Sequence, residues 1–192
     1  MSSKFDTIII GAGIAGLLTA LRLSQRGQKV LVIEKDKIGS GSTLSNHGMI
    51  HSGALYVGQH PHIVQNCKEA QGAFKTLLAE AEIPSENSVY ISTKRNLNKF
   101  MKLLDRYKFD YEKISPDEVP EIKPDIARIY NFITIKEGVF SSGTILRILT
   151  AYCFANKVEF LLGTRISKII KKSKKIKGVI VGANEYLTCN NV

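Results

Sequence analysis

Hydrophobic and polar positions in the first 34 residues follow the order of a strand, a turn, a helix and a second strand. Residues 5–10, Phe-Asp-Thr-Ile-Ile-Ile, form a β-branched run that is typical of a buried parallel strand. From Ile14 the apolar residues recur at i, i+3, i+4 and i+7, and Gly27 stands where a helix-ending glycine is expected. Residues 30–33, Val-Leu-Val-Ile, form the second apolar run. The pattern therefore predicts a βαβ unit.

The remaining pattern predicts further helices and short strands. Helices are expected at residues 62–83, 97–107 and 142–155, and strands at 88–92, 128–135, 158–162, 165–170, 177–181 and 186–189. Ser115, Pro116 and Glu118 have the order of an N-cap, a first-turn proline and a capping-box acid. In the first of these helices the inward residues are expected to be Ile63, Ala70, Phe74, Leu77 and Ala81. The last three strands predict a small β-meander.

The turn of the βαβ unit reads Gly11-Ala-Gly13-Ile-Ala-Gly16, the spacing of a dinucleotide-binding turn. Gly11 allows the tight turn, Gly13 lets the backbone approach a diphosphate, and Gly16 lets helix and strand pack closely. Glu34 ends the second strand, where a carboxylate can accept hydrogen bonds from ribose hydroxyls and would repel a 2'-phosphate. The predicted contacts to the nucleotide are Gly11, Gly13, Ile14, Ala15, Gly16, Glu34 and Lys35. These residues do not distinguish NAD from FAD.

Composition is that of a globular protein. Of the 192 residues, 44% are hydrophobic and 23% are charged, which is enough apolar content for a sizeable core. No segment has the features of a signal peptide or the apolar length of a membrane span. We therefore expect a cytoplasmic protein without a transmembrane segment, and a peripheral membrane contact stays open.

Cysteines and lysines could indicate other functions. Cys67, Cys153 and Cys189 are odd in number and far apart, so we expect small core residues rather than disulfides or a metal site. The net charge of +10 could suggest nucleic-acid binding. However, much of the excess comes from a cluster without arginine or aromatic residues, namely Lys168, Lys171, Lys172, Lys174, Lys175 and Lys177. This cluster favours a solvated hairpin turn, and we expect no nucleic-acid partner.

Residues 42–56 read Ser-Thr-Leu-Ser-Asn-His-Gly-Met-Ile-His-Ser-Gly-Ala-Leu-Tyr and contain two of the four histidines. Together with the preceding unit, this stretch resembles the FAD-dependent oxidoreductases of the D-amino-acid oxidase superfamily. It is most similar to the branch of FAD-dependent glycerol-3-phosphate dehydrogenases and L-2-hydroxyglutarate dehydrogenases. That branch carries Asn-His-Gly-x-x-His-Ser-Gly-x-Arg-Tyr, and this chain matches it at Asn46, His47, Gly48, His51, Ser52, Gly53 and Tyr56.

The resemblance implies FAD as the cofactor and hydride transfer from a small hydroxy acid, glycerol 3-phosphate or amine to flavin N5, with quinone or oxygen as electron acceptor. Further cofactor contacts are implied at Ser42, Thr43, Ser45, Asn46, His47, Gly48 and Ile166. His51 is implied to lie beside the flavin, where it is a candidate base or a site of covalent attachment, and Tyr56 is implied on the substrate side. From the residues alone, a histidine in such a loop can equally serve only to orient the backbone.

Two departures from the branch affect the expected substrate. Leu55 stands where the branch usually has an arginine that holds the substrate phosphate, and Ser45 replaces another frequent arginine. Leucine cannot make charge-assisted bonds to an anion. Glycerol 3-phosphate is therefore less expected than the resemblance by itself implies.

Later stretches extend the resemblance along nearly the whole chain. Residues 114–119 with 122–124 are similar to the segment ahead of the substrate-domain strands, and Glu137-Gly-Val-Phe resembles the family's Asp-Gly-x-Val step. We expect an α/β chain with an FAD/NAD(P)-binding Rossmann-like fold, that is, a parallel sheet with a β-meander plus part of an α+β substrate domain. The expected division is residues 1–83 and 137–192 for FAD binding and 84–136 for the substrate.

Family members are longer, so we expect an N-terminal portion whose C-terminal half is missing or supplied by a partner chain. Two alternatives stay open at this point. The first is a truncated, catalytically inactive dinucleotide-binding module or a subunit that a partner completes. The second is an NAD-dependent dehydrogenase.

Overall fold

The computed structural model describes residues 4–77, 85–119, 122–173 and 175–192, and the chain forms two compact units. Unit 1 consists of residues 1–47 and 141–192, and unit 2 of residues 48–140. Unit 2 is thus inserted between the two halves of unit 1. Helix α2 (Pro61–Leu77), which the sequence pattern assigned to the first cofactor segment, lies in unit 2. The functional division at residues 83/84 and 136/137 stays a prediction.

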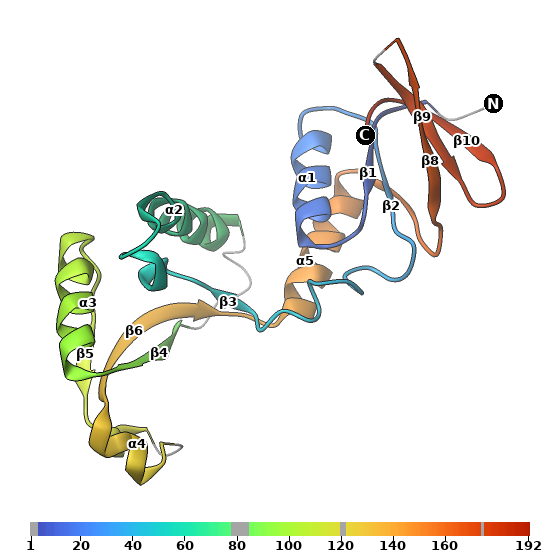
Figure 1. Cartoon of the computed structure of the whole chain (residues 1–192). Coiled ribbons are helices and arrows are strands. Elements are labelled where there is room, and N and C mark those ends of the chain that lie inside the picture. The colour runs from blue at the N-terminus through green and yellow to red at the C-terminus, as the bar shows by residue number, and fades with distance from the viewer. Residues whose placement is uncertain (1–3, 78–84, 120–121, 174) are drawn as a thin grey trace. The chain divides into compact units, whose positions relative to one another are not determined.

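Unit 1 is built on a six-stranded sheet with the order β7-β2-β1-β10-β9-β8 (Figure 1). Its strands are β1 (Lys4–Ile10), β2 (Val30–Ile33), β7 (Glu159–Leu161), β8 (Ile166–Lys172), β9 (Lys175–Val181) and β10 (Glu185–Asn191). Strand β1 pairs in parallel with β2 on one side and with β10 on the other, and β2 pairs in parallel with β7. Strands β8, β9 and β10 pair antiparallel. The predicted parallel sheet with a β-meander is confirmed.

Two helices, α1 (Ile14–Ser24) and α5 (Ser142–Ala155), pack against each other in unit 1 (Figure 1). Their buried residues include Leu17, Leu21 and Leu149. Cys153 is buried at this contact, and its thiol donates to the carbonyl oxygen of Leu17 at 3.4 Å. A second cluster joins β1 and β2 to the meander, with Phe5, Ile8, Leu31, Ile33, Val179, Val181, Leu187 and Cys189 as its buried residues. All four residues of β2 are buried, which explains why this strand reads as a continuous apolar run.

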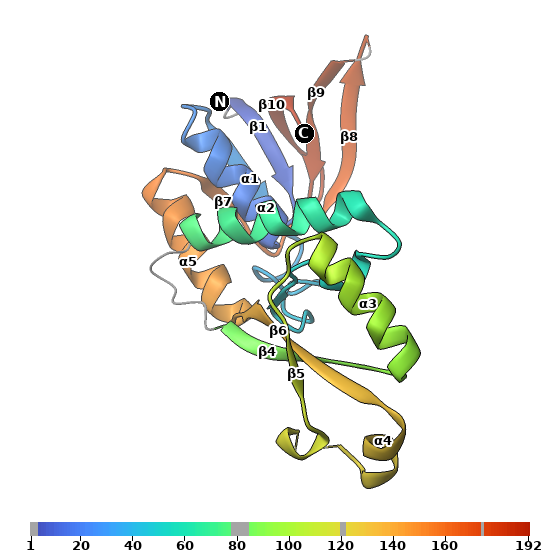
Figure 2. The same cartoon turned by 90° about the vertical axis from the view of Figure 1, so that its left-hand side faces the viewer.

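In its described residues, unit 2 contains a smaller sheet together with several helices (Figure 2). The sheet has the order β3-β6-β4, with β5 also paired to β6; its strands are β3 (Met49–Ile50), β4 (Ser85–Ser92), β5 (Glu112–Ile114) and β6 (Asn131–Val139). The helices are α2, α3 (Lys94–Arg106) and α4 (Pro124–Ile129), with single turns η1 (Ala54–Tyr56) and η3 (Pro116–Glu118). The core of the unit consists of Ala54, Val57, Val64, Leu97, Met101, Leu104, Ile133 and Ile135.

Most predicted elements are confirmed, some with the predicted ends. Strand β2 and helix α5 have the expected bounds, and the capping box at Ser115 is formed. The strand predicted at 128–135 begins too early, because residues 124–129 form α4, with Pro124 at its first position. In α2 the predicted inward face is partly wrong: Ala70 is exposed and Val64 is buried. Residues 78–83 of that predicted helix lie outside the described residues.

The described lysines of the cluster lie on the β8–β9 hairpin, as expected, whereas Lys174 lies outside the described residues. Lys168, Lys171, Lys172, Lys175 and Lys177 are exposed there. Cys153 and Cys189 are buried core residues, while Cys67 is half-buried. In the part of the chain that the structure describes, no helix combines the length and apolar character needed to cross a membrane.

Candidate functional site

The glycine turn between β1 and α1 depends on the backbone conformation of Gly11 and on close packing at Gly16. Gly11 has a φ of 102°, a conformation that favours glycine. A Cβ atom at Gly16 would overlap the carbonyl oxygen of Gly11, so the first turn of α1 lies directly on the end of β1. Gly13 is the N-cap of α1 and has no side-chain capping bond. The turn therefore presents the N-terminus of an 11-residue helix, a site that suits an anion.

Glu34 lies next to this turn at the carboxyl end of β2 and is only 9% exposed. Its Oε2 accepts a hydrogen bond from the Ala12 N–H at 2.9 Å, and its Oε1 accepts one from the Asp36 N–H at 3.0 Å. Burial alone would raise the pKa of this carboxyl, but the hydrogen bonds from the Ala12, Asp36 and Lys35 amides lower it below its ordinary value. Glu34 is therefore ionised at neutral pH and held as an acceptor.

A cavity of about 300 Å³ opens beside Glu34 within unit 1. Its lining comes from the carboxyl ends of β1 and β2 and from the start of β8, and consists of Ile10, Gly11, Ile33, Glu34, Lys35, Thr164, Arg165 and Ile166. Parallel α/β sheets bind ligands at this edge of the strands. The cavity brings Ile166, predicted as a cofactor contact, to the same place as Glu34 and Lys35.

The loop after β2 brings Thr43 to the N-terminus of α1. The Ile14 N–H donates to Thr43 Oγ1 at 3.1 Å, and a Cβ atom at Gly13 would meet the same oxygen at 3.0 Å. Thr43 thus adds a hydroxyl to the amides of the glycine turn. The other predicted contacts of the loop, Ser42, Ser45, Asn46 and His47, are exposed, as is Ala15 on α1.

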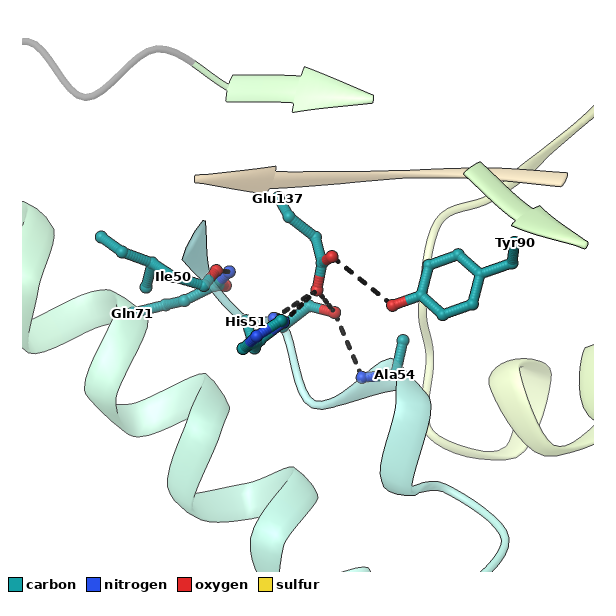
Figure 3. A network of polar contacts seen from close by, with 7 residues as sticks. Ile50, His51, Ala54, Gln71, Tyr90 and Glu137 are labelled. Carbon is teal, nitrogen blue, oxygen red and sulfur yellow. Dashed lines mark hydrogen bonds and ion pairs between the residues drawn. The ribbon is translucent and has the colours of Figure 1, made fainter. Parts of the chain in front are cut away.

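Unit 2 holds a second group of polar residues around Glu137, which lies on β6 (Figure 3). The Glu137 side chain is 2% exposed. Its Oε1 accepts hydrogen bonds from both the N–H and the hydroxyl of Ser52 at 2.7 Å, and it lies 4.0 Å from Nδ1 of His51. Its Oε2 accepts a bond from the Tyr90 hydroxyl at 3.5 Å, and the Ser88 side chain also hydrogen-bonds to the carboxylate. Four residues from two other segments therefore converge on one carboxylate.

The electrostatics of this group follow from burial and hydrogen bonding. Burial would raise the pKa of Glu137, yet its bonds from Ser88 and Ser52 and the nearby His51 lower it below the ordinary value of 4.5. Burial and the negative charge of Glu137 together raise the pKa of Tyr90 strongly, so its hydroxyl stays a donor. The group therefore carries a negative charge on Glu137 at neutral pH.

The segment around His51 owes its shape to small residues. Gly53 has a φ of 90° and precedes η1, and Ser52 Oγ accepts a hydrogen bond from the Ala54 N–H at 3.1 Å. Gly48, predicted as a cofactor contact, is buried: its carbonyl accepts the Phe140 N–H at 3.0 Å, and a Cβ there would overlap the Phe140 carbonyl oxygen. Tyr56, predicted on the substrate side, packs against the hydrophobic core of unit 2.

The predicted site residues thus fall into two sets. One set lies in unit 1 and consists of the glycine turn together with Glu34, Lys35, Thr43 and Ile166. The other set lies in unit 2 and consists of Gly48, His51 and Tyr56. Glu137, Ser88 and Tyr90 were not predicted as site residues, because they reach His51 and Ser52 only through the folding of the sheet. The sequence signals for Glu137 were its place two residues after the predicted strand that ends at Ile135 and the resemblance of residues 137–140 to the family's Asp-Gly-x-Val step.

Comparison with known proteins gives a consistent result. The family described as "FAD dependent oxidoreductase" (DAO) matches residues 6–192. The chain is 27% identical over 128 residues to a component of the anaerobic glycerol-3-phosphate dehydrogenase of Escherichia coli, covering 65% of this chain and 24% of that protein. It is 36% identical over 96 residues to the L-2-hydroxyglutarate dehydrogenase of Indibacter alkaliphilus, covering 47% and 24%.

Among solved structures, glycine oxidase from Bacillus cereus superposes with a TM-score of 0.80 at 20% identity, covering 97% of this chain and 53% of that one. This likeness shows a shared fold. The matched residues span about a quarter of the length of each of these two dehydrogenases from Escherichia coli and Indibacter alkaliphilus.

Proposed function

The chain belongs to the DAO family of FAD-dependent oxidoreductases, and we propose that its unit 1 binds the ADP part of FAD and that His51 serves the oxidation of a small hydroxylated or aminated substrate. FAD is the cofactor of the family, so the NAD-dependent alternative loses its support.

The observation that carries the proposal is the group formed by the glycine turn, Thr43 and Glu34. The amides at the start of α1 and the Thr43 hydroxyl can donate to a diphosphate, which also gains from the positive end of the helix dipole. The ionised Glu34 can accept the ribose hydroxyls, and the adjoining cavity has apolar walls from Ile10 and Ile166 that suit a base. The residues present therefore fit an adenine dinucleotide.

When bound, FAD supplies an acceptor for the hydride that leaves the substrate carbon. The residues of this chain would have three tasks in that reaction. The glycine turn and Glu34 bind and orient the nucleotide, the fixed 51–54 segment orients the imidazole, and His51 takes the proton of the substrate hydroxyl or amine. Quinone or oxygen would then serve as the electron acceptor.

For the substrate we favour a small hydroxy acid over glycerol 3-phosphate. Leu55, which occupies the position where the resembling branch carries an arginine, is 62% exposed and offers no charge to a phosphate. The Indibacter alkaliphilus relative is named for a hydroxy acid, L-2-hydroxyglutarate. Glycerol 3-phosphate is the second candidate, because the Escherichia coli relative is named for it.

The test of the proposal is flavin binding by the purified chain. We expect added FAD to be retained and its fluorescence to be quenched, and we expect Gly13→Asp to abolish retention by placing a carboxylate against the diphosphate. The apo form of this variant should stay folded, because an acid at a helix N-terminus is favourable. Gly143→Asp puts the same substitution in the first turn of α5, with only ordinary contacts to its Cβ, and should leave binding unchanged.

Equal FAD retention by wild type and Gly13→Asp would refute the assignment of the turn. FAD retention without flavin reduction by L-2-hydroxyglutarate, glycerol 3-phosphate or an amino acid would instead favour the alternative of a dinucleotide-binding module without activity.

A further inference from the structure

We propose that Glu137 is a positioning residue that fixes the imidazole of His51 with its proton on Nδ1 and its lone pair on Nε2. The role given to His51 in proton transfer rests on the proposed function. The contact between the two side chains does not depend on it.

The carboxylate of Glu137 has a fixed place. Ser52 donates two hydrogen bonds to Oε1, and Tyr90 reaches Oε2 from the neighbouring strand β4 (Figure 3). On β6, Glu137 follows Ile133 and Ile135 at spacings of two, so it lies on the face of the strand that carries the core of unit 2. A side chain held by three donors at 2% exposure cannot adopt other positions freely.

The carboxylate of Glu137 also fixes the backbone of His51. The Ser52 N–H that donates to Glu137 belongs to the peptide group following His51. On the other side, the carbonyl oxygen of Ile50 accepts a hydrogen bond from Gln71 of α2 at 2.9 Å. Both peptide groups that flank His51 are therefore hydrogen-bonded to neighbouring elements. The His51 side chain itself is 41% exposed, so it can be reached from solvent.

The position of the carboxylate determines which imidazole nitrogen of His51 carries the proton. Nδ1 of His51 faces the buried carboxylate at 4.0 Å. Among the described residues, Tyr90 on β4 and Cys67 on α2 are also titratable groups near Glu137. Burial and Glu137 raise the pKa of both, so neither adds a charge. In neutral imidazole the two tautomers differ in which nitrogen carries the proton, and a negative charge favours the N–H that points toward it. The Nδ1–H tautomer leaves Nε2 as the proton acceptor.

This arrangement suits the proposed reaction. Bound FAD would supply the acceptor for the hydride of the substrate carbon, and Nε2 of His51 would take the proton of the substrate hydroxyl or amine, which leaves a carbonyl or imine. The imidazolium formed in that step is stabilised by the carboxylate beside Nδ1, which does not need to take the proton itself.

The tautomer can be measured without flavin or substrate. Long-range ¹H–¹⁵N correlation spectra of the chain labelled with ¹⁵N-histidine separate the two tautomers, and His51→Asn identifies the signals of His51 among the four histidines. At about pH 9, well above the ordinary histidine pKa of about 6.5, we expect His51 to be mainly the Nδ1–H form. Glu137→Gln should shift the tautomer ratio toward Nε2–H by about tenfold, which corresponds to about 1.4 kcal/mol.

Tyr90→Phe is the matched control, because it removes a donor from Oε2 and keeps the charge beside Nδ1; the ratio should stay within about twofold of wild type. An Nε2–H tautomer in the wild-type chain would overturn the proposal even if Glu137→Gln failed to fold. An unchanged ratio in a folded Glu137→Gln variant would overturn it as well. Failure of the proposed function would appear separately, as absence of FAD binding.

Discussion

Two buried glutamates, one in each unit, show two ways in which this protein holds a negative charge. Glu34 is bound by backbone amides that belong to the glycine turn and to its own loop. Glu137 is bound mainly by side chains from segments that are distant in sequence, with Ser52 85 positions away. The first arrangement lies beside an open cavity, whereas the second lies on the face of β6 that carries a hydrophobic core. An acid held by local backbone is available to a ligand, and an acid held by distant side chains organises the residues around it.

The largest expected effect is on the free energy of unfolding, and it should differ between substitutions at Glu137 and at Glu34. Glu137→Ala should lower the free energy of unfolding by about 3–5 kcal/mol, because it leaves Ser52 and Tyr90 without their buried acceptor. Glu34→Ala should cost about 1–3 kcal/mol, since the two amides it releases lie near the edge of the sheet. Urea unfolding followed by circular dichroism measures both. The exposed Glu185 serves as control, and Glu185→Ala should change stability by less than about 0.5 kcal/mol. An equal loss of unfolding free energy in Glu34→Ala and Glu137→Ala would show that the two carboxylates contribute equally to stability.

A smaller effect tests whether the nucleotide turn depends on close backbone packing. Gly16→Ala places a Cβ against the carbonyl oxygen of Gly11, and we expect a loss of about 1–3 kcal/mol together with weaker FAD binding. Gly72→Ala in α2 is the matched substitution in unit 2, where nothing lies within 4 Å of the added carbon. It should leave FAD binding unchanged and stabilise the helix by about 0.5–1 kcal/mol. Tolerance of alanine at position 16 would show that α1 can move away from β1.

The pH dependence of stability shows how much the charge of each glutamate contributes. Both glutamates have a pKa lowered from 4.5 in the folded chain, so their contribution is complete above that value and is lost as the pH falls through the lower folded pKa values. The stability difference between wild type and Glu137→Gln should therefore be greatest at neutral pH and should shrink below about pH 4.5. Urea midpoints of both proteins from pH 7 to pH 3 give this difference. A difference that stays constant with pH would mean that the charge of Glu137 does not contribute.

The smallest effect on folding is expected at Leu55, which follows the His51 segment in sequence. Because Leu55 is 62% exposed, Leu55→Arg should change the free energy of unfolding by less than about 0.5 kcal/mol. If the proposed site binds glycerol 3-phosphate, the new charge should improve its affinity about ten- to hundredfold, the equivalent of one charge-assisted bond. Titration of the FAD-loaded protein with glycerol 3-phosphate measures this. Tight binding by the unchanged protein would show that another residue holds the phosphate.

The same difference between local and distant contacts explains what the sequence could predict. The turn, α1 and β2 were predictable because Gly11, Gly16 and Glu34 lie within one βαβ unit, where spacing alone carries the geometry. Helix α5 was also predicted to the residue, since its apolar period is regular and Ser141 provides the N-cap. Each of these features depends on neighbours within about one supersecondary unit.

The features that escaped prediction depend on tertiary contacts. The burial of Val64 rather than Ala70 in α2 reflects which side of that helix meets the core residues of α3 and β6. The partners of Glu137 come from β4 and from the segment after β3, and no spacing rule joins residues 52, 90 and 137. The start of β6 was misplaced because a short helix begins at a proline shortly before it.

The position of β1 between β2 and β10 has a consequence for how the chain is made. Residues 4–7 find their parallel partners at 188–191, so one side of β1 has to wait until almost all of the sequence in between has been synthesised. At typical translation rates this delay is roughly 10–40 s. Unit 2 is continuous in sequence and can fold during that interval, while the apolar edge of β1 stays unpaired. Such an edge in a nascent chain is a template for wrong strand pairing. Contacts between residues so far apart in sequence also form slowly. We therefore expect folding of unit 1, rather than unit 2, to require chaperones most during translation.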